Sequence, residues 1–301
     1  MPLSKRRSRL HESVRDAVAT ITAESAAEHV RQLTSLGPRD AHRPAAVDAT
    51  LAHLTDRLES FGYKTVEERY GVGRHQTNVL ATLPGQRTDL PLLEIGAHWD
   101  TVPGSPGADD NASGIAGLLE IARCLQAAGP FPRGIRFCCF AEEESGLLGS
   151  FAHVERLDKG SVDGLISLEM IGFRTTAPES QQTPLRVPLL FSPPRVGDFI
   201  TAVADLRSTS YADAFTQGAA QCAPGLQVFS VRRIGGLLKD ASRSDHLPYW
   251  RSRRKGLLVT DTANLRNQHY HRESDTIETL DFEFLADVAR AAAGAAAILA
   301  R

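Results

Sequence analysis

Apolar runs alternate with helix-like segments along most of the chain, and this order constrains the fold more than any other feature of the sequence. Several runs are apolar almost throughout, which is typical of strands buried on both faces of a sheet. Pro188 allows its run at most an edge position, because proline cannot donate a ladder hydrogen bond. The strand-like runs are Lys64–Glu68, Thr77–Leu83, Leu92–Ala97, Gly134–Phe140, Gly164–Glu169, Val187–Phe191, Gln227–Val231 and Gly256–Thr260.

The segments that flank and separate these runs read as helices, several of them with apolar residues at spacings of three and four. Strands that alternate with helices predict a three-layer α/β/α sandwich with a mixed, largely parallel central sheet. In such sheets, functional residues collect at the carboxyl ends of the strands. The expected helices are Leu10–Leu36, Pro44–Phe61, Ser113–Ala127, Gly146–Arg156, Arg195–Leu206 and Asp281–Leu299.

We expect a single domain over residues 1–301, with an N-terminal helical extension at 1–30 and a surface excursion at 173–194. Of the 301 residues, 42% are hydrophobic, which is enough for one large core. The excursion contains five prolines, and long loops of this kind often form a wall of a substrate cleft.

Charge and composition give no sign of a nucleic-acid or membrane partner. The net charge is −2, and no run reaches the ~18 apolar residues of a membrane span. No apolar segment follows the basic start at residues 5–9, so we expect no signal peptide and a cytoplasmic protein. The four cysteines contain no Cys-x-x-Cys pair, which favours a reduced compartment. Cys138 and Cys139 are interpreted as small buried residues rather than thiolate ligands.

Histidines and carboxylates follow several of the strand-like runs. Imidazole and carboxylate groups together indicate a divalent metal site, and the number of acids favours two ions over one. The candidate residues are His98, Asp100, Asp109, Asp110, Glu142, Glu143, Glu144, Glu169 and His271.

The spacing of these residues predicts the chemical role of each. His98 and Asp100 are two residues apart, so both can point to one side of a strand end, where Asp100 can accept the ring N–H of His98. Asp109 begins a helix-like stretch and is placed to bridge two cations, with a helix N-cap as the alternative. Consecutive glutamates point in opposite directions, so within 142–144 one can bind metal while its neighbour acts as general base.

Six motifs in a fixed order make the likeness to a known family specific. They are His-Trp-Asp, Gly-Ala-Asp-Asp-Asn-Ala-Ser-Gly, Glu-Glu-Ser-Gly-Leu-Leu-Gly-Ser, Leu-Glu-Met-Ile-Gly, Ser-Asp-His-Leu-Pro-Tyr and Tyr-His-Arg-Glu-Ser-Asp-Thr, between His98 and Thr276. With them the chain resembles the co-catalytic dizinc aminopeptidases, a family of bacterial leucyl-aminopeptidase-like zinc metallopeptidases related to glutamate carboxypeptidase and glutaminyl cyclase.

This resemblance implies a zinc-exopeptidase-like fold and an activity. The implied reaction is hydrolysis of the N-terminal peptide bond of a peptide with a free N-terminus, by a hydroxide that bridges two Zn²⁺ ions, with cobalt or manganese as alternative metals. The motif match makes Glu143 the general base, and Asp100, which orients His98, is the second residue expected to be catalytic. It makes His98, Asp109 and Glu169 the ligands of one ion, and Asp109, Glu144 and His271 the ligands of the other.

Some positions and functions stay open at this stage. Many relatives have aspartate at the position of Glu169, so the longer side chain is a departure from the pattern. His269 competes with His271, although the Tyr-His-x-x-x-Asp-Thr pattern selects His271. Asp245 resembles a family acid behind the site, with a helix N-cap as its alternative role. The alternative functions are a glutaminyl-cyclase-like acyltransferase with a single zinc and a non-catalytic binding protein. The side-chain specificity and the oligomeric state are not predicted.

Overall fold

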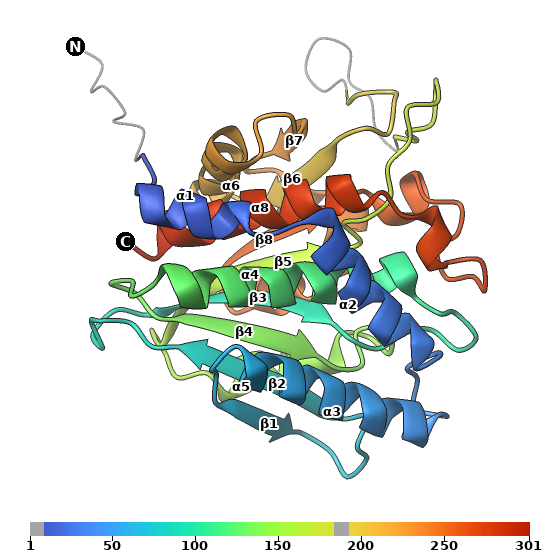
Figure 1. Cartoon of the computed structure of the whole chain (residues 1–301), viewed down its shortest axis with the longest axis horizontal. Helices are drawn as coiled ribbons and strands as arrows, with labels where there is room; N and C mark the ends of the chain where they lie inside the picture. The colour runs from blue at the N-terminus through green and yellow to red at the C-terminus, as the bar shows by residue number, and fades with distance from the viewer. Residues whose placement is uncertain (1–8, 184–192) are drawn as a thin grey trace.

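An eight-stranded sheet runs through the described part of the chain, residues 9–183 and 193–301 of a computed structural model (Figure 1). Its strand order is β1-β2-β4-β3-β5-β8-β6-β7. β4, β3, β5 and β8 are parallel neighbours, whereas β1, β2 and the β6–β8 pairing are antiparallel. The strands are β1 Thr65–Arg69, β2 Thr77–Leu83, β3 Leu92–His98, β4 Ile135–Phe140, β5 Val162–Glu169, β6 Ile200–Ala204, β7 Val228–Val231 and β8 Lys255–Thr260.

Helices cover both faces of this sheet, so the predicted α/β fold with a mixed, largely parallel sheet is confirmed. The larger core joins one face of the sheet to α1, α2, α3, α4, α6 and α8, and Figure 1 shows α4 and α8 in front of the strands on that face. A smaller core on the other face includes residues of α5 and α7. The helices are α1 Glu12–Ala19, α2 Ala23–Ser35, α3 Pro44–Ser60, α4 Gly114–Ala128, α5 Leu148–Arg156, α6 Thr209–Cys222, α7 His246–Arg251 and α8 Phe282–Leu299.

The N-terminal segment forms two helices where the sequence predicted one. The chain leaves the helical path between α1 and α2, where the Thr22 hydroxyl accepts a hydrogen bond from the backbone N–H of Ser25 and caps α2. Val14, Val18 and Val30 are buried in the larger core. The expected extension is therefore packed against the rest of the molecule.

The prediction of a helix at Arg195–Leu206 is wrong, because residues Ile200–Ala204 form strand β6. This short apolar run carries no clear period, and its burial between β7 and β8 favours the extended form. The helix lies further along the chain as α6, which the sequence analysis did not predict. The expected strand Val187–Phe191, with Pro188, lies outside the described residues.

None of the described helices combines the length and the apolar character that a membrane span requires.

The feature of the fold that matters most for function is the group of neighbouring strands β4, β3 and β5. These three strands are parallel, so their carboxyl ends meet at one edge of the sheet.

Candidate metal centre

The carboxyl ends of three central strands bring most of the predicted site residues together. His98 is the last residue of β3, and Glu169 is the last residue of β5. Glu143 and Glu144 lie in the turn that follows β4. His271 arrives from the distant segment between β8 and α8.

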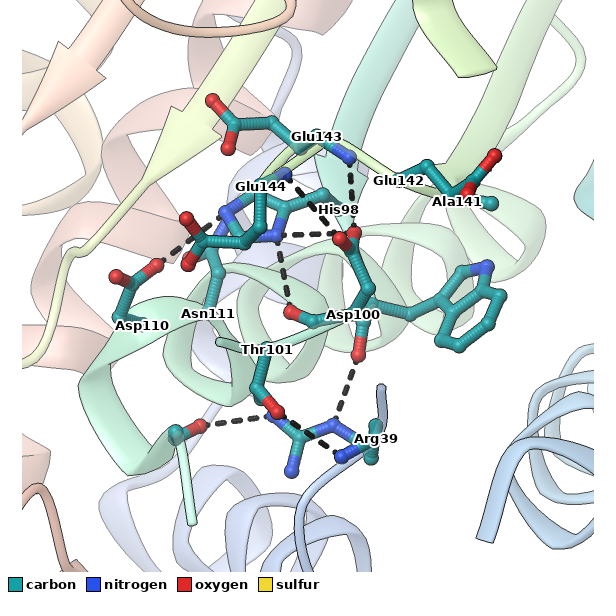
Figure 2. A network of polar contacts seen from close by, with 12 residues as sticks. Arg39, His98, Asp100, Thr101, Asp110, Asn111, Ala141, Glu142, Glu143 and Glu144 are labelled. Carbon is teal, nitrogen blue, oxygen red and sulfur yellow. Dashed lines mark hydrogen bonds and ion pairs between the residues drawn. The ribbon is translucent and has the colours of Figure 1, made fainter. Parts of the chain in front are cut away.

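Two groups of potential metal ligands lie side by side and share Asp110. Figure 2 shows three of their residues, His98, Asp110 and Glu144. In the first group, His98 Nε2 lies 3.3 Å from Asp110 Oδ1 and 3.5 Å from Glu169 Oε2. In the second, His271 Nε2 lies 3.2 Å from Asp110 Oδ2 and 3.0 Å from Glu144 Oε2. Each group combines imidazole with carboxylates, a donor set that suits Zn²⁺ and similar ions.

The residue between the two groups is Asp110, and the placement of Asp109 at this position is wrong. The carboxylate of Asp109 accepts hydrogen bonds from the backbone N–H of Gly172 at 3.0 Å and from Asn267 Nδ2 at 2.7 Å. The cause is local: the backbone of Asp110 and Asn111 leaves helical geometry, so the chain does not begin the regular helix that the sequence suggested. As a result Asp110, and not Asp109, faces His98 and His271.

Asp100 connects the histidine side of the site to the glutamate turn. His98 Nδ1 donates to the backbone carbonyl of Asp100 at 3.1 Å and lies 3.4 Å from its Oδ1. The two carboxylate oxygens of Asp100 accept the backbone N–H groups of Glu143 and Glu144, at 3.1 and 3.2 Å. Because Nδ1 carries the proton that it donates to Asp100, Nε2 is unprotonated and free to bind a metal.

The three consecutive glutamates point in different directions. Glu142 accepts a hydrogen bond from the Tyr70 hydroxyl at 3.0 Å and points away from His98 in Figure 2. Glu144 contacts His271, whereas Glu143 belongs to neither ligand group. Burial raises the pKa of Glu143 well above its usual range, with the charges of Glu169 and other carboxylates adding to the effect and His98 opposing it.

Further polar residues surround the site. The Ser244 hydroxyl donates to Glu169 Oε2 at 2.8 Å. Asp245 is fully buried, and burial together with neighbouring carboxylates raises its pKa to about 7, against the opposing charge of His98. His269 contacts Ser274 at 2.9 Å and is part of neither ligand group.

Asp275 is a site residue that the sequence analysis did not single out. Its carboxylate accepts the backbone N–H groups of Asp109 at 2.9 Å and Asp110 at 3.1 Å, so it fixes the segment that carries the shared ligand. The available signal was its place in the Tyr-His-Arg-Glu-Ser-Asp-Thr motif.

The ligand atoms themselves fit a metal. Among the described residues, His98 Nε2, Asp110 Oδ2 and Glu144 Oε1 are buried and form no hydrogen bond, although an ion-pair partner lies 3.3 Å from His98 Nε2 and 3.2 Å from Asp110 Oδ2. Buried polar atoms without a hydrogen bond are costly, and these three belong to residues of the two ligand groups. Cations bound between the groups would remove that cost.

An apolar cavity of about 360 Å³ opens beside Glu169. The strands β6, β7 and β8 form part of its wall, and the connecting segments supply most of the other lining residues, including Arg243, Asn264 and Tyr270. The apolar lining residues are Pro193, Phe199, Val203, Phe229, Val231, Leu238, Ala241, Leu258, Ala263 and Leu265. The cavity is therefore suited to an apolar group held next to the ligand cluster.

Comparisons with known proteins agree with this fold. Solved structures of similar fold include the Legionella pneumophila aminopeptidase LapA, with a TM-score of 0.75 and 22% identity over 96% of this chain and 75% of that one. Another is BSAP, a zinc aminopeptidase from Bacillus subtilis, with a TM-score of 0.69 and 17% identity over 90% of this chain and 94% of that one. These likenesses show a shared fold.

Sequence similarity identifies the family. YfbL of Escherichia coli K12, an uncharacterised protein, is 33% identical over 274 residues, which cover 86% of this chain and 83% of YfbL. Residues 78–296 match the model of peptidase family M28, and this match includes every residue of the two ligand groups. The resemblance carried by the six motifs is confirmed, and the chain belongs to peptidase family M28.

Proposed function

We propose that this protein is a metal-dependent aminopeptidase that removes an apolar N-terminal residue from peptides, using two Zn²⁺ ions. The observation that carries the proposal is the sharing of Asp110, which presents one carboxylate oxygen to each of two ligand groups. The aminopeptidases LapA and BSAP, the latter a zinc enzyme, share the fold and support the same activity for this chain.

The two ions would be held by six ligand positions that five residues supply. His98, Asp110 and Glu169 would bind one ion, and Asp110, Glu144 and His271 the other. Three carboxylates carry three negative charges, which offset most of the charge of two divalent cations. When bound, the ions would acidify a water molecule, polarise the scissile carbonyl and stabilise the developing oxyanion.

Glu143 would act as the general base and then as the general acid. The residue is only 8% exposed, and its position in the turn after β4 is fixed by the hydrogen bond from its backbone N–H to Asp100. A carboxylate with a raised pKa is a stronger base towards water than an ordinary one, and near neutral pH its protonated form persists long enough to supply the leaving amine. Glu142 is engaged by Tyr70, so the geometry supports Glu143 over Glu142 in this role.

The apolar cavity would receive the side chain of the N-terminal residue. Among the described lining residues the only carboxylate is that of Glu169, which we assign to the metal, and Arg243 places a positive charge on the wall. Arg243 is held by Asn264 Oδ1 at 3.2 Å and by the Tyr270 hydroxyl at 3.0 Å. We therefore expect leucine, methionine or phenylalanine to be preferred over lysine or arginine.

The proposal is tested with zinc-loaded protein and a panel of aminoacyl-anilides. We expect release of anilide from the leucine and phenylalanine substrates, slower release from the lysine substrate, and none from an N-acetylated leucine control that lacks a free amine. If the protein hydrolyses none of these anilides, the aminopeptidase assignment is rejected. Cyclisation of an N-terminal glutamine peptide, without hydrolysis, would favour the glutaminyl-cyclase alternative.

A further inference from the structure

Arg39 is a buried cation directly behind the candidate metal centre. It lies in the connection between α2 and α3, outside the residues that match the family model, and its side chain is almost completely buried. Burial lowers its pKa to about 10, with the nearby carboxylates of Asp275, Asp100 and Asp110 opposing the effect, so the guanidinium stays charged at neutral pH.

The guanidinium binds backbone carbonyls of the segment that links His98 to the shared ligand Asp110. Its Nε donates to the carbonyl of Trp99 at 2.8 Å, and its two terminal nitrogens donate to Pro106 at 2.7 Å and Gly107 at 2.9 Å. Figure 2 shows Arg39 beside Asp100 and Thr101. Both ends of the segment at 99–107 are therefore tied to one rigid, planar group.

The backbone of Arg39 adds a second connection to the same segment. Its N–H donates to the Thr101 hydroxyl at 2.9 Å, and its carbonyl accepts the N–H of Thr101 at 3.4 Å. This packing requires glycine at position 107. The residue has φ +60°, and a Cβ there would lie 2.9 Å from Arg39 Nη2 and 2.3 Å from Thr101 Cγ2.

We propose that Arg39 is a positioning residue that clamps segment 99–107 and thereby sets Asp100 and Asp110 for metal binding. Arg39 holds the carbonyls of the segment, while Asp275 holds the N–H groups of Asp109 and Asp110 just beyond it. Without the clamp, Asp110 loses its fixed place between the two histidines. The expected effect on metal binding rests on the proposed function, whereas the hydrogen bonds that form the clamp do not depend on it.

The test compares Arg39→Met with Arg290→Met as a matched control. Arg290 also donates two hydrogen bonds to a backbone carbonyl, that of Ile21, on the packing face of α8 away from the ligand groups. Two quantities are measured for each variant: hydrogen exchange of the amides at 99–110 in metal-free protein, and zinc affinity by competition with a chelator.

We expect Arg39→Met to speed exchange at 99–110 and to weaken zinc binding about tenfold or more, as is common for groups that orient metal ligands. Arg290→Met should leave both unchanged even if it lowers the melting temperature. Arg39→Lys keeps the charge but not the planar fork, so its zinc affinity should fall between wild type and Arg39→Met, and it serves if Arg39→Met does not fold. Unchanged exchange at 99–110 in the Arg39 variants would overturn the clamp.

Faster exchange with unchanged zinc affinity would overturn the link to the metal and leave the clamp as purely structural. A wild-type protein that binds no zinc would instead reject the proposed function. In that case the exchange measurement still decides whether the clamp exists, so the two failures are distinguishable.

Discussion

Glu143 combines burial with a position beside the ligand groups but outside both of them. We predict that Glu143→Gln keeps its bound metal and loses turnover by about 100-fold or more, because the amide cannot accept the proton. The measurements are kcat with a leucine anilide and the metal content of the purified variant. Glu142→Gln is the matched control and should keep nearly full activity. Equal activity of Glu143→Gln and wild type would rule out the assigned base.

Arg243 provides a prediction about specificity. Like charges a few ångströms apart in water repel by about 1 kcal/mol, so removing the guanidinium in Arg243→Ala should raise kcat/KM for a lysine anilide relative to a leucine anilide by about fivefold. The ratio of the two kcat/KM values is the quantity to measure, because it cancels any general loss of activity. A ratio equal to that of wild type would show that Arg243 does not influence this choice.

Single residues also show the limit of the sequence analysis. His98, Glu144, Glu169 and His271 were predicted as ligands and lie in the two groups, because each follows a strand or a distinctive motif. The shared aspartate was predicted one position too early. Residue spacing in the sequence cannot distinguish two adjacent aspartates. The backbone angles at Asp110 decide which of the two faces the histidines.

At the scale of elements, a buried ionic cluster joins β1, β3 and α5 beneath the site. His153 Nδ1 lies 3.0 Å from Glu68 Oε2, and its Nε2 lies 3.1 Å from Glu94 Oε1. Arg136 and the Tyr249 hydroxyl also donate to Glu94, at 3.0 and 2.6 Å. The cluster places an imidazolium between two carboxylates and connects the strand of His98 to the helix after the glutamate turn.

The cluster predicts a pH dependence of stability. Burial lowers the pKa of His153, but hydrogen bonds to Cys138, Glu68 and Glu94 outweigh it and raise the pKa well above 6.5. The resulting stabilisation is fully present below pH 6.5 and is lost as the pH rises through the folded-state pKa. The pKa of Glu94 is lowered below 4.5, mainly by His153 against the effect of burial, so its contribution is lost as the pH falls through that lower value.

His153→Gln should therefore be destabilised by about 3 kcal/mol near pH 6, because it removes the cation that lies between Glu68 and Glu94 and leaves Glu94 with Arg136 as its charged partner. The difference in the free energy of unfolding between wild type and variant should shrink as the pH rises above the folded-state pKa of His153. Urea denaturation of metal-free protein over a pH series measures this difference. A difference that is constant across the series would show that His153 is not charged in the folded state.

The elements were predictable where their pattern was long or strongly apolar. The structure has β2 at the predicted bounds, and α8 begins one residue later than expected. The region around β6 was not predictable, because a five-residue run of small and β-branched residues fits a strand or a helix equally well. Its pairing with β8, a strand more than fifty residues away in the chain, decides the outcome.

At the scale of the whole molecule, the sheet brings distant parts of the chain to one edge. β3, β4 and β5 supply His98, the glutamate turn and Glu169, while the segment before α8 supplies His271 and Asp275. The connection between α2 and α3 adds Arg39. The proposed two-metal site depends on all of these segments and has its centre at Asp110.

The number of zinc ions bound per chain tests this account most directly. It is measured by elemental analysis after zinc loading and removal of free metal, for wild type and for the isosteric variants Asp110→Asn and Asp109→Asn. We predict about two ions for wild type and for Asp109→Asn, and one or fewer for Asp110→Asn, because a neutral amide cannot hold both cations as a carboxylate can. A fully active wild-type protein with a single zinc, or an Asp110→Asn variant that retains both ions, would contradict it.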